Sequence, residues 1–542
     1  MGGRRGPRVA TLAAVVACAF GCGCTIRDAA PEAPLARGVT FDISADPRTL
    51  DPLFAHVDSG AVEPELARLA FEPFFDLDER GRPVPALLRE MPTRANGGVS
   101  PDGRTLRYHL RPGIRWSDGV PVTSRDVLFT LRAILDPSNP VASREGYDRI
   151  VRAEAPDART VVFHLRAAWA PAVLTYFAYG TTPQFVLPEH VLAAQAPLER
   201  APFGGAPSVS DGPFRFVEWR RGDGLAYVAN PRYWRGPPGL ARLDVRVVPD
   251  PNTNLLLMRT GAIDFNLLAP VQIASLAGRP GIRFRDVPTA IVAGLALATM
   301  HEPMNDVRIR RVVAESIDRA AISRLITLGH YPVANSDRPR FSFAYDPTLR
   351  QPAFDPARAD RDLDAAGWHP GREGVRIKDG HVLAMTYVAF PESTTGIRVA
   401  VFIQEELRDR GFLIDQKAIS NEQLFLPEFG TLARGEFDAA YVPFAMGADP
   451  DDRFVYGCAG AEQNYMHYCD PTVERLEARA ASAGSERARH ALYATIDRIV
   501  ARDVPVLWLF RANYTYAYRA RLGGFSPNAF SPTWNAWQWR VR

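Results

Sequence analysis

Five cysteines are the side chains with the clearest capacity for covalent chemistry in this chain of 542 residues. Three of them lie within the first 24 residues, while Cys458 and Cys469 lie eleven positions apart near the other end. In an exported protein, two cysteines at that separation are typical of a disulfide that closes a small loop. A metal site would recruit His467 between them, but three ligands without a matching fourth make a poor zinc set. We therefore expect a disulfide, and neither a metal ion nor a cofactor.

Signatures of catalysis are missing from the sequence. The ten histidines are scattered, neither HExxH nor GxSxG occurs, and no cysteine has an obvious histidine partner. The phosphate-binding pattern GxxxxGK[ST] is also missing, so we do not expect ATP hydrolysis by this chain. The sequence therefore predicts a protein that is not an enzyme, with a secreted hydrolase of unrecognised type as a remote alternative.

The overall charge argues against nucleic acid as a partner. Sixty-four basic and 61 acidic residues give a formal net charge of +3, whereas phosphate binding usually shows as clustered excess positive charge. Hydrophobic residues make up 46% of the chain and charged residues 23%, enough apolar material for a large core spread over several domain-sized units. The longest apolar run is too short to span a bilayer, which excludes a polytopic membrane protein.

The amino terminus has the features of an export signal. Three arginines within the first eight residues precede the apolar stretch 9–20, and small residues follow it. Cys22, preceded by glycine, resembles the cysteine of a bacterial lipobox, which predicts removal of residues 1–21 and lipid attachment at Cys22. Cys24 is a rival lipidation site, and an ordinary cleaved signal is the alternative. Residues 22–36 are rich in Ala, Pro and charge and predict a flexible tether.

Beyond the tether, strands and helices alternate, which predicts a mixed α/β fold. Alternating or apolar runs predict strands at 38–43, 104–110, 160–165 and 243–248. Apolar residues at i, i+4 spacing or strong start signals predict helices at 124–135, 307–321, 396–410 and 470–481. Thr123 and Asp306 suit the N-caps of the first two helices, and Gly411 suits the end of the third.

Six groups of residues with specific spacing follow one another along the chain. The most specific runs over 110–130 and includes Trp116, Asp118, Gly119 and Thr123. The others contain Asp211, Gly212, Pro213 and Trp234; Pro249, Asp250 and Gly261; Asp306, Arg308 and Arg310; Asp355, Pro356 and Trp368; and Asp449, Pro450 and Asp451. In this order they resemble the extracytoplasmic solute-binding proteins of peptide-type ABC transporters, the oligopeptide-, dipeptide- and nickel-binding group known as family 5.

The resemblance implies a two-lobe periplasmic-binding-protein fold of type II, with a hinge and an extra subdomain in the first lobe. Lobe I is expected at 37–290 and 510–542, and lobe II at 291–509. The apolar segments 291–299 and 504–510 are the expected crossover strands between the lobes. Lobe closure over ligand is the motion that such a hinge would permit.

The resemblance also implies partners and location. A peptide or small organic solute would be the ligand, and ABC permease subunits would receive it. The lipid anchor would hold a monomer to the membrane, in the periplasm or at the cell surface. A chemosensory or chaperone-like binding protein that feeds no transporter is the alternative role.

Two positions depart from the pattern of dipeptide-binding relatives. Those relatives hold the peptide amine with a carboxylate and the peptide carboxylate with an arginine, because a buried charged terminus needs a partner. Met446 and Phe390 occupy the corresponding positions here. This argues against a short free dipeptide and favours a longer peptide held along its backbone, or a less charged organic solute. A shifted alignment would let Asp449, Glu392 or Arg398 serve instead.

Ligand contacts are expected from four places in the chain. Aromatic side chains with a few polar groups are typical of a ligand cleft. On this basis the candidate ligand-binding residues are His56, Asp58 and Ser59; Asn421; Tyr441, Phe444 and Met446; and Trp508 and Arg511. For each of them, the alternative to ligand binding is a role in the fold or at the surface.

Overall fold

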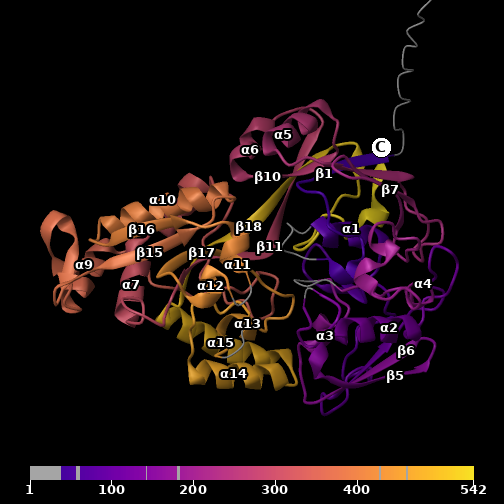
Figure 1. The fold of residues 1–542 in the computed structure, drawn as a ribbon, viewed down its shortest axis with the longest axis horizontal. Helices are drawn as coiled ribbons and strands as arrows, with labels where there is room; N and C mark the ends of the chain where they lie inside the picture. Colours follow the sequence, from indigo (N-terminus) through magenta and orange to yellow (C-terminus); the bar gives the residue numbers. More distant parts are fainter. Residues whose placement is uncertain (1–37, 56–61, 142, 180–183, 427–428, 459–461) are drawn as a thin grey trace, which may run out of the picture. The chain divides into compact units, whose positions relative to one another are not determined.

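The computed structural model describes residues 38–55, 62–141, 143–179, 184–426, 429–458 and 462–542. The predicted signal peptide and tether lie outside these ranges, as do Cys22, His56, Asp58 and Ser59. Everything from Arg37 onward forms one compact unit. The expected mixed α/β class is confirmed: helices pack around one large sheet, with several small sheets beside it (Figure 1).

The large sheet has ten strands in the order β16-β15-β17-β11-β18-β10-β1-β9-β8-β7 within the described residues. Its strands are β1 (Gly38–Ile43), β7 (Phe214–Arg220), β8 (Gly224–Ala229), β9 (Arg242–Val247), β10 (Phe265–Leu268), β11 (Ile282–Leu297), β15 (Ala384–Ala389), β16 (Leu413–Ala418), β17 (Ala439–Ala445) and β18 (Val506–Arg519). The order is not sequential, so segments far apart in the chain meet at the centre of the sheet.

The smaller sheets lie at the periphery. Their strands are β2 (Phe75–Leu77) with β3 (Pro83–Pro85); β4 (Thr105–His109), β5 (Ile150–Asp157) and β6 (Thr160–Leu165); β12 (His369–Pro370), β13 (Arg376–Lys378) and β14 (His381–Val382); and β19 (Leu522–Gly523) with β20 (Arg540–Val541). The β4-β6-β5 sheet, together with α2, forms the lower part of the indigo and purple region in Figure 1.

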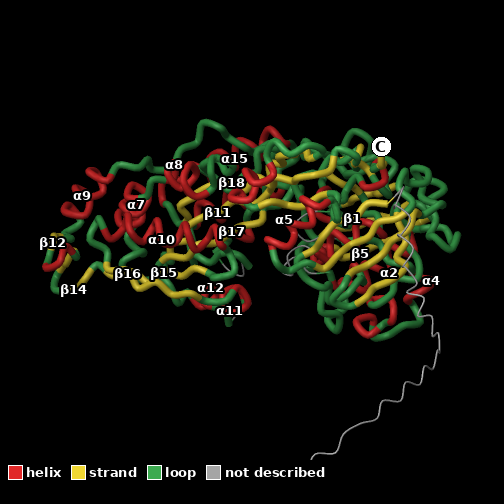
Figure 2. Tube along the Cα trace, turned by 90° about the horizontal axis from the view of Figure 1, so that it is seen from above, coloured by secondary structure: helices red, strands yellow, loops and turns green. Residues whose placement is uncertain are grey.

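The helices vary from a single turn to eighteen residues. They are α1 (Val62–Ala70), α2 (Ser124–Leu135), α3 (Ala172–Thr175), α4 (Glu189–Leu192), α5 (Pro251–Thr260), α6 (Pro270–Leu276), α7 (Val307–Ser316), α8 (Arg319–Ala321), α9 (Pro356–Ala365), α10 (Thr394–Arg408), α11 (Asn421–Phe425), α12 (Thr431–Arg434), α13 (Arg453–Tyr456), α14 (Pro471–Ser482) and α15 (Glu486–Asp503). Figure 2 shows α7 and α10 beside the strands of the second half of the chain.

Two long antiparallel strands, β11 and β18, occupy the middle of the sheet. They run side by side from the magenta and indigo elements into the orange elements of Figure 1. Residues 282–288 of β11 pair with the end of β18. Residues 291–297 pair with β17, and residues 292–296 pair with β18 as well. The β11–β18 register shifts between Pro288 and Val292. Both strands are longer than the predicted crossover segments 291–299 and 504–510.

Two separate hydrophobic cores lie on either side of this interruption. The first contains residues between 39 and 287 together with residues between 516 and 539, and takes in Ala481. The second contains only residues between 292 and 510. A small third cluster lies under α5 and α6. Along β11 and β18, the residues change from the first core to the second at the point where the pairing between the two strands is interrupted.

Several local predictions from the sequence are confirmed. Strands at 38–43 and 160–165 and the helix at 124–135 have the predicted bounds. Thr123 and Asp126 form a reciprocal capping box, with the Thr123 backbone N–H donating to Asp126 Oδ2 at 2.7 Å. Such a cap contributes about 1 kcal/mol. The helices predicted at 396–410 and 470–481 correspond to α10 and α14.

The predicted single helix over 307–321 is wrong, because two helices occupy this stretch. α7 ends at Ser316, and Ile317 has an extended conformation with φ −106° and ψ 115°. Asp318 then caps α8 by accepting a hydrogen bond from the Ala321 N–H at 2.8 Å. The apolar spacing continued across the break, but an N-cap side chain at 318 begins a new helix instead.

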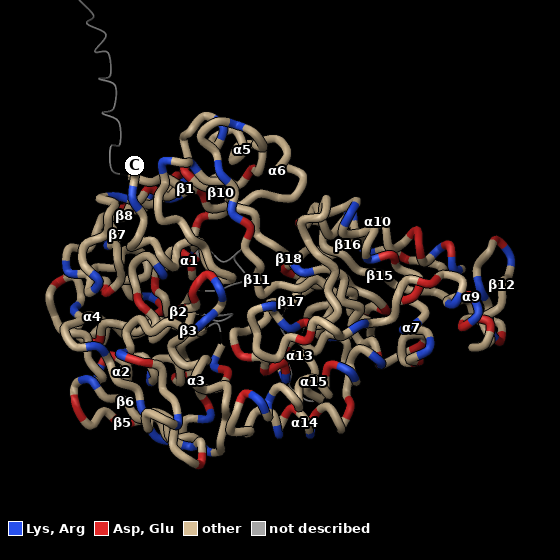
Figure 3. The backbone as a smooth tube through the Cα atoms, turned by 180° about the vertical axis from the view of Figure 1, so that it is seen from behind, with Lys and Arg blue, Asp and Glu red and all other residues tan. Residues whose placement is uncertain are grey.

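The disulfide between Cys458 and Cys469 is present, as the sequence predicted. Within the described residues, no helix has both the length and the apolar character needed to cross a membrane. Basic and acidic side chains are interspersed along the chain (Figure 3), which agrees with the nearly balanced charge.

Candidate functional site

A groove lies between the residues of the two hydrophobic cores. It consists of two adjoining cavities of about 480 Å³ and about 100 Å³ that share Trp169, Leu174, Ala448 and Asp449 in their walls. One wall comes from residues 77–106 and 143–184, and the other from residues 341–343, 447–454 and 482–489. The larger cavity has the size of a small-molecule or peptide site.

The segment that follows β17 builds the second wall. β17 pairs with β11 up to Ala445, and the Met446 N–H donates to the Ala290 carbonyl at 3.0 Å. The chain then turns, and Asp452 precedes α13. This arrangement places Gly447, Ala448 and Asp449 at the groove, at the end of a strand that is fixed on both sides.

Ion pairs hold the acidic side chains of this wall. Asp449 accepts two hydrogen bonds from Arg489 of α15, one of them at 2.7 Å from Nη1. Asp451 accepts from Arg453, with 2.6 Å between Arg453 Nη2 and Asp451 Oδ2. Burial alone would raise the pKa of Asp451, but the hydrogen bonds and charge of Arg453 lower it below its usual value. Both carboxylates are therefore already paired with an arginine.

Contacts also cross the groove. Trp169 Nε1 donates to Asp451 Oδ2 at 3.4 Å, and the Ala170 N–H donates to the Ala481 carbonyl at 2.6 Å. The Arg149 guanidinium lies 4.8 Å from the centre of the Trp169 ring. Trp169 thus supplies an apolar surface, fixed by a cation–π contact, at the point where the two walls meet.

Two further polar groups face the smaller cavity. Burial and the negative charge of Asp451 raise the pKa of Glu145 to about 7. Gln184 is 2% exposed, and its Oε1 has no hydrogen-bond partner in the described part of the chain. A buried amide oxygen without a donor is costly, so this group is available to a ligand that brings an N–H.

The predicted residues on β17 do not line either cavity. Tyr441, Phe444 and Met446 are 5%, 0% and 3% exposed and belong to the second core. Phe444 contacts Trp508 with ring centres 5.1 Å apart, and Tyr441 contacts Phe390 at 5.9 Å. Their place in a ligand site stays a prediction, and the structure shows them as the aromatic support behind the groove wall.

The other predicted contacts have partners within the protein. Trp508 is 1% exposed, and its backbone N–H donates to Gln351 Oε1 at 2.8 Å. Arg511 is buried and donates to the Ser336 carbonyl at 2.8 Å. Asn421 begins α11 at the surface, and its backbone N–H lies 3.3 Å from both oxygens of Glu392. The predicted set is therefore not gathered into one cavity.

Two positions carry charged anchors in dipeptide-binding relatives. Here both positions have apolar side chains and apolar surroundings. Met446 and Phe390 are both buried in the second core. Among the possible substitutes, Asp449 is paired with Arg489, and Arg398 lies within 3.4 Å of the Leu325 carbonyl. Asp449 could therefore take the role expected at Met446 only by giving up its ion pair with Arg489.

Trp169, Glu145 and Gln184 were missed by sequence reasoning. The only local signal was a tryptophan between two alanines and before Pro171, in a stretch without regular periodicity. Nothing in that stretch shows that it will face residues almost 300 positions further along the chain.

Comparison with known proteins agrees with the fold and the groove. The family model of the bacterial extracellular solute-binding proteins, family 5 Middle, matches residues 82–466. Protein XP55 of Streptomyces lividans is 28% identical over 527 residues, covering 96% of this chain and 91% of that protein. Di/tripeptide-binding protein 2 of Pseudomonas aeruginosa is 26% identical over 465 residues, covering 80% and 83%.

Among solved structures, the oligopeptide-binding protein AppA of Bacillus subtilis in complex with a nonapeptide has the same fold. The TM-score is 0.78 at 20% identity, and the match covers 93% of this chain and 99% of AppA. The family match extends over most of the chain and includes parts of both core clusters, together with residues 341–343 and 447–454 of the second wall of the groove. The chain belongs to family 5 of the bacterial extracellular solute-binding proteins.

Proposed function

We propose that this protein is the solute-binding lipoprotein of an ABC importer, which captures a peptide or related organic solute and delivers it to permease subunits. The observation that supports this most strongly is the groove between two separate cores that are joined through β11 and β18. Its role is capture and release, not catalysis. The lipid at Cys22 would hold the protein to the membrane, where a monomer can meet its permease.

The proposed lobes are 37–290 with 510–542, and 291–509. The two core clusters support this division, apart from Ala481 in the first cluster and Phe510 in the second. The proposed hinge is the interrupted stretch of β11 between Pro288 and Val292 and the facing part of β18. In the described structure this stretch is interrupted only in its pairing with β18, while Ala290 and Ile291 bond to the β17 segment, so a change of φ and ψ here would disturb few β11–β18 contacts. A ligand that contacts both walls of the groove would favour the closed arrangement.

The proposed ligand is a peptide of more than two residues that is held along its backbone. Without a free carboxylate at Met446 or an arginine at Phe390, charged peptide ends gain no ion pair at those positions. The 480 Å³ cavity and the unpartnered Gln184 Oε1 suit backbone amides better than a zwitterion. Relatives in the family bear names for different lengths, from a di/tripeptide-binding protein to AppA with a nonapeptide.

A thermal-shift panel tests this proposal. The purified chain is melted with dipeptides, tri- to pentapeptides, oligosaccharides and metal chelates. A ligand at about 100 times its dissociation constant stabilises the folded state by about 2.7 kcal/mol, which is measurable. Stabilisation by tri- to pentapeptides and not by dipeptides is expected. Stabilisation by dipeptides would contradict the proposed loss of the end anchors, and a shift with only oligosaccharides or chelates would contradict a peptide ligand.

A further inference from the structure

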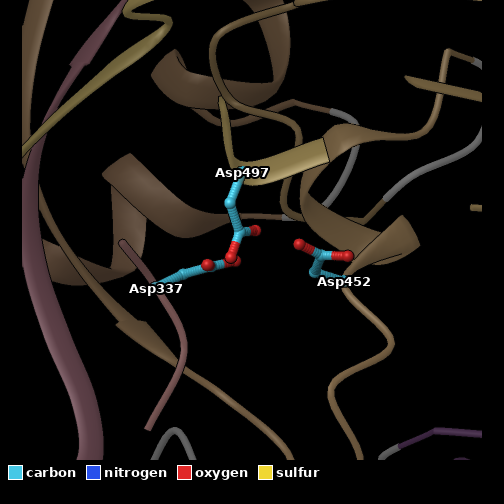
Figure 4. A group of neighbouring side chains, drawn as sticks. All are labelled: Asp337, Asp452 and Asp497. Carbon is cyan, nitrogen blue, oxygen red and sulfur yellow. The ribbon is translucent and has the colours of Figure 1, made fainter. Parts of the chain in front are cut away.

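Arg338 lies at the centre of a buried acidic cluster in the second core region. Its guanidinium contacts one oxygen of each of three aspartates: Nη2 is 2.6 Å from Asp452 Oδ2 and 3.0 Å from Asp497 Oδ1, and Nε is 3.7 Å from Asp337 Oδ1. All four residues are at most 5% exposed. Asp337 precedes Arg338 in a long loop, Asp452 caps α13, and Asp497 lies on α15. Three separate segments therefore bring these side chains together (Figure 4).

The second carboxylate oxygen of each aspartate is unpaired within the described residues. Within the described residues, Asp337 Oδ2, Asp452 Oδ1 and Asp497 Oδ2 have no hydrogen-bond donor. One carboxylate oxygen from each aspartate lies within 4.8 Å of an oxygen from the other two. Three acceptor oxygens from three carboxylates at such spacing have the geometry of an oxygen-lined cation site.

The cluster contains more acidic side chains than basic ones. Glu477 of α14 is fully buried and lies against Asp452, and its side chain is hydrogen-bonded to that of Asp452 when one of the two carboxyl groups carries a proton. Four carboxyl groups thus face the single guanidinium of Arg338. Arg453 lies nearby but is already paired with Asp451. Burying unpaired carboxylates is strongly unfavourable unless protons or a cation compensate them.

A separate side chain also points to a missing partner. Tyr456 is 2% exposed, and its hydroxyl has no hydrogen-bond partner in the part of the chain that the structure describes. It lines a small cavity together with Asp337, Asp497 and Trp508. A buried hydroxyl without a partner is unusual, and this one faces the aspartates.

We propose that Asp337, Asp452 and Asp497 bind one hard divalent cation on the side of the cluster away from Arg338. The hard cations Ca²⁺ and Mg²⁺ prefer carboxylate and hydroxyl oxygens, and their charge would offset most of the excess. Tyr456 contributes its hydroxyl to the polar lining. The site is distinct from the groove and does not depend on which solute the groove binds.

The cation would fix the wall of the groove from behind. Arg338 also donates through Nη1 to the Pro450 carbonyl, and Asp452 follows Asp451 in the segment that lines the smaller cavity. Asp497 and Glu477 lie on α15 and α14, and α15 also carries Arg489, the partner of Asp449. Binding of the ion would therefore connect the loop around 338, the 450–456 segment and both helices into one rigid unit.

Calorimetry and melting of the full chain test the proposal. The chain is stripped with EDTA, dialysed, and titrated with Ca²⁺, Mg²⁺ and Mn²⁺ in the absence of any solute. We expect one ion per chain, a rise in melting temperature that saturates with binding, and terbium luminescence sensitised by the neighbouring Trp508. An unchanged melting temperature with all three ions, together with no binding heat, would overturn the proposal and assign the cluster to shared protons instead.

Two variants and a matched control locate the ion. Asp337→Asn keeps the shape of the side chain and should weaken binding at least about tenfold, as one charged ligand is lost. Tyr456→Phe, which keeps the buried ring, should weaken it less. Asp364→Asn, at a carboxylate half exposed on α9, should leave affinity unchanged. Equal affinity in wild type and a folded Asp337→Asn variant would contradict this site.

Discussion

Single residues decide which ligands the groove can hold. Asp449 and Asp451 have arginine partners, and Gln184 Oε1 has no donor within the described residues. Glu145 and Arg94 also line the groove. An ionised peptide end would have to displace an existing pair to bind Asp449 or Asp451, which makes these two carboxylates poor end anchors.

Asp51 gives a pH-dependent prediction at the residue scale. It is 1% exposed, its side chain accepts from the Leu53 N–H at 2.9 Å, and burial raises its pKa to about 7. Because the folded state holds this proton more tightly than the unfolded state, stability from Asp51 is present at low pH and lost as pH rises from about 4 to 7. Asp51→Asn should raise the free energy of unfolding by about 2–4 kcal/mol at pH 8.

The same substitution should change stability little at pH 4, where both carboxyl and amide are neutral. Asn keeps the acceptor oxygen for Leu53 and adds a donor, as the protonated acid does. Urea unfolding at the two pH values measures the difference. If Asp51→Asn raised the free energy of unfolding as much at pH 4 as at pH 8, burial of the charge would not be the cause of the increase.

The lipid anchor gives a second residue-scale prediction. In cells fed labelled palmitate, the wild-type chain should be labelled and membrane-bound. Cys22→Ser should lose the label and release the protein, because the cysteine thiol is the acceptor of the lipid. Cys24→Ser is the matched control and should stay labelled. Loss of the label with Cys24→Ser alone would assign the lipid to Cys24.

At the scale of elements, β11 and β18 are packed closely at Gly294. A Cβ at this position would lie 2.4 Å from Val506 Cγ1 and 3.0 Å from Trp508 Cε3. Both neighbours are fully or almost fully buried, so neither can move without disturbing the second core. The missing side chain at Gly294 allows the two strands and the Trp508 ring to fit together.

Gly294→Ala should therefore lower the free energy of unfolding by about 1–3 kcal/mol through overpacking. Gly205→Ala is the control, since a Cβ there meets its nearest atom at 3.7 Å and the φ of −94° suits any residue. Denaturant unfolding of both variants gives the comparison. Equal stability of Gly294→Ala and wild type would contradict the packing seen between β11 and β18.

Local patterns in the sequence predicted elements well where the signal was complete within one segment. Thr123 with Asp126 marked the start of α2, and Asp470 before Pro471 marked α14. The break at Ile317 was missed because the apolar spacing continued through it, while the capping side chain of Asp318 acted against the pattern. Helix propensity alone does not show which of the two effects, apolar spacing or N-capping, decides where the helix ends.

The candidate site was less predictable than the fold. Trp169 faces Asp451, and Asp337 faces Asp452 and Asp497, across 100 residues or more of intervening chain in most of these pairs. No local spacing encodes such a meeting, because it depends on the order of strands in the ten-stranded sheet. Trp508 was singled out as an aromatic near a crossover, and its burial against Gly294 follows only from the register of β11 and β18.

At the scale of the whole molecule, two cores share one sheet and enclose a groove between them. Under the proposed hinge motion, each core would stay packed while the groove opened and closed around the interrupted strands. Asp449 and Asp451, with their charges paired, line this groove, whereas the apolar residues Met446 and Phe390 are buried in the second core.

The most direct measurement compares free and blocked forms of the same peptide by calorimetry. The pentapeptide that binds most tightly in the thermal-shift panel is titrated with free ends, then with an acetylated amine and an amidated carboxylate. A peptide held along its backbone should bind with dissociation constants that differ by less than about threefold, under 1 kcal/mol. A loss of about 100-fold or more on blocking would show that charged ends are anchored, and would contradict the proposed mode of recognition.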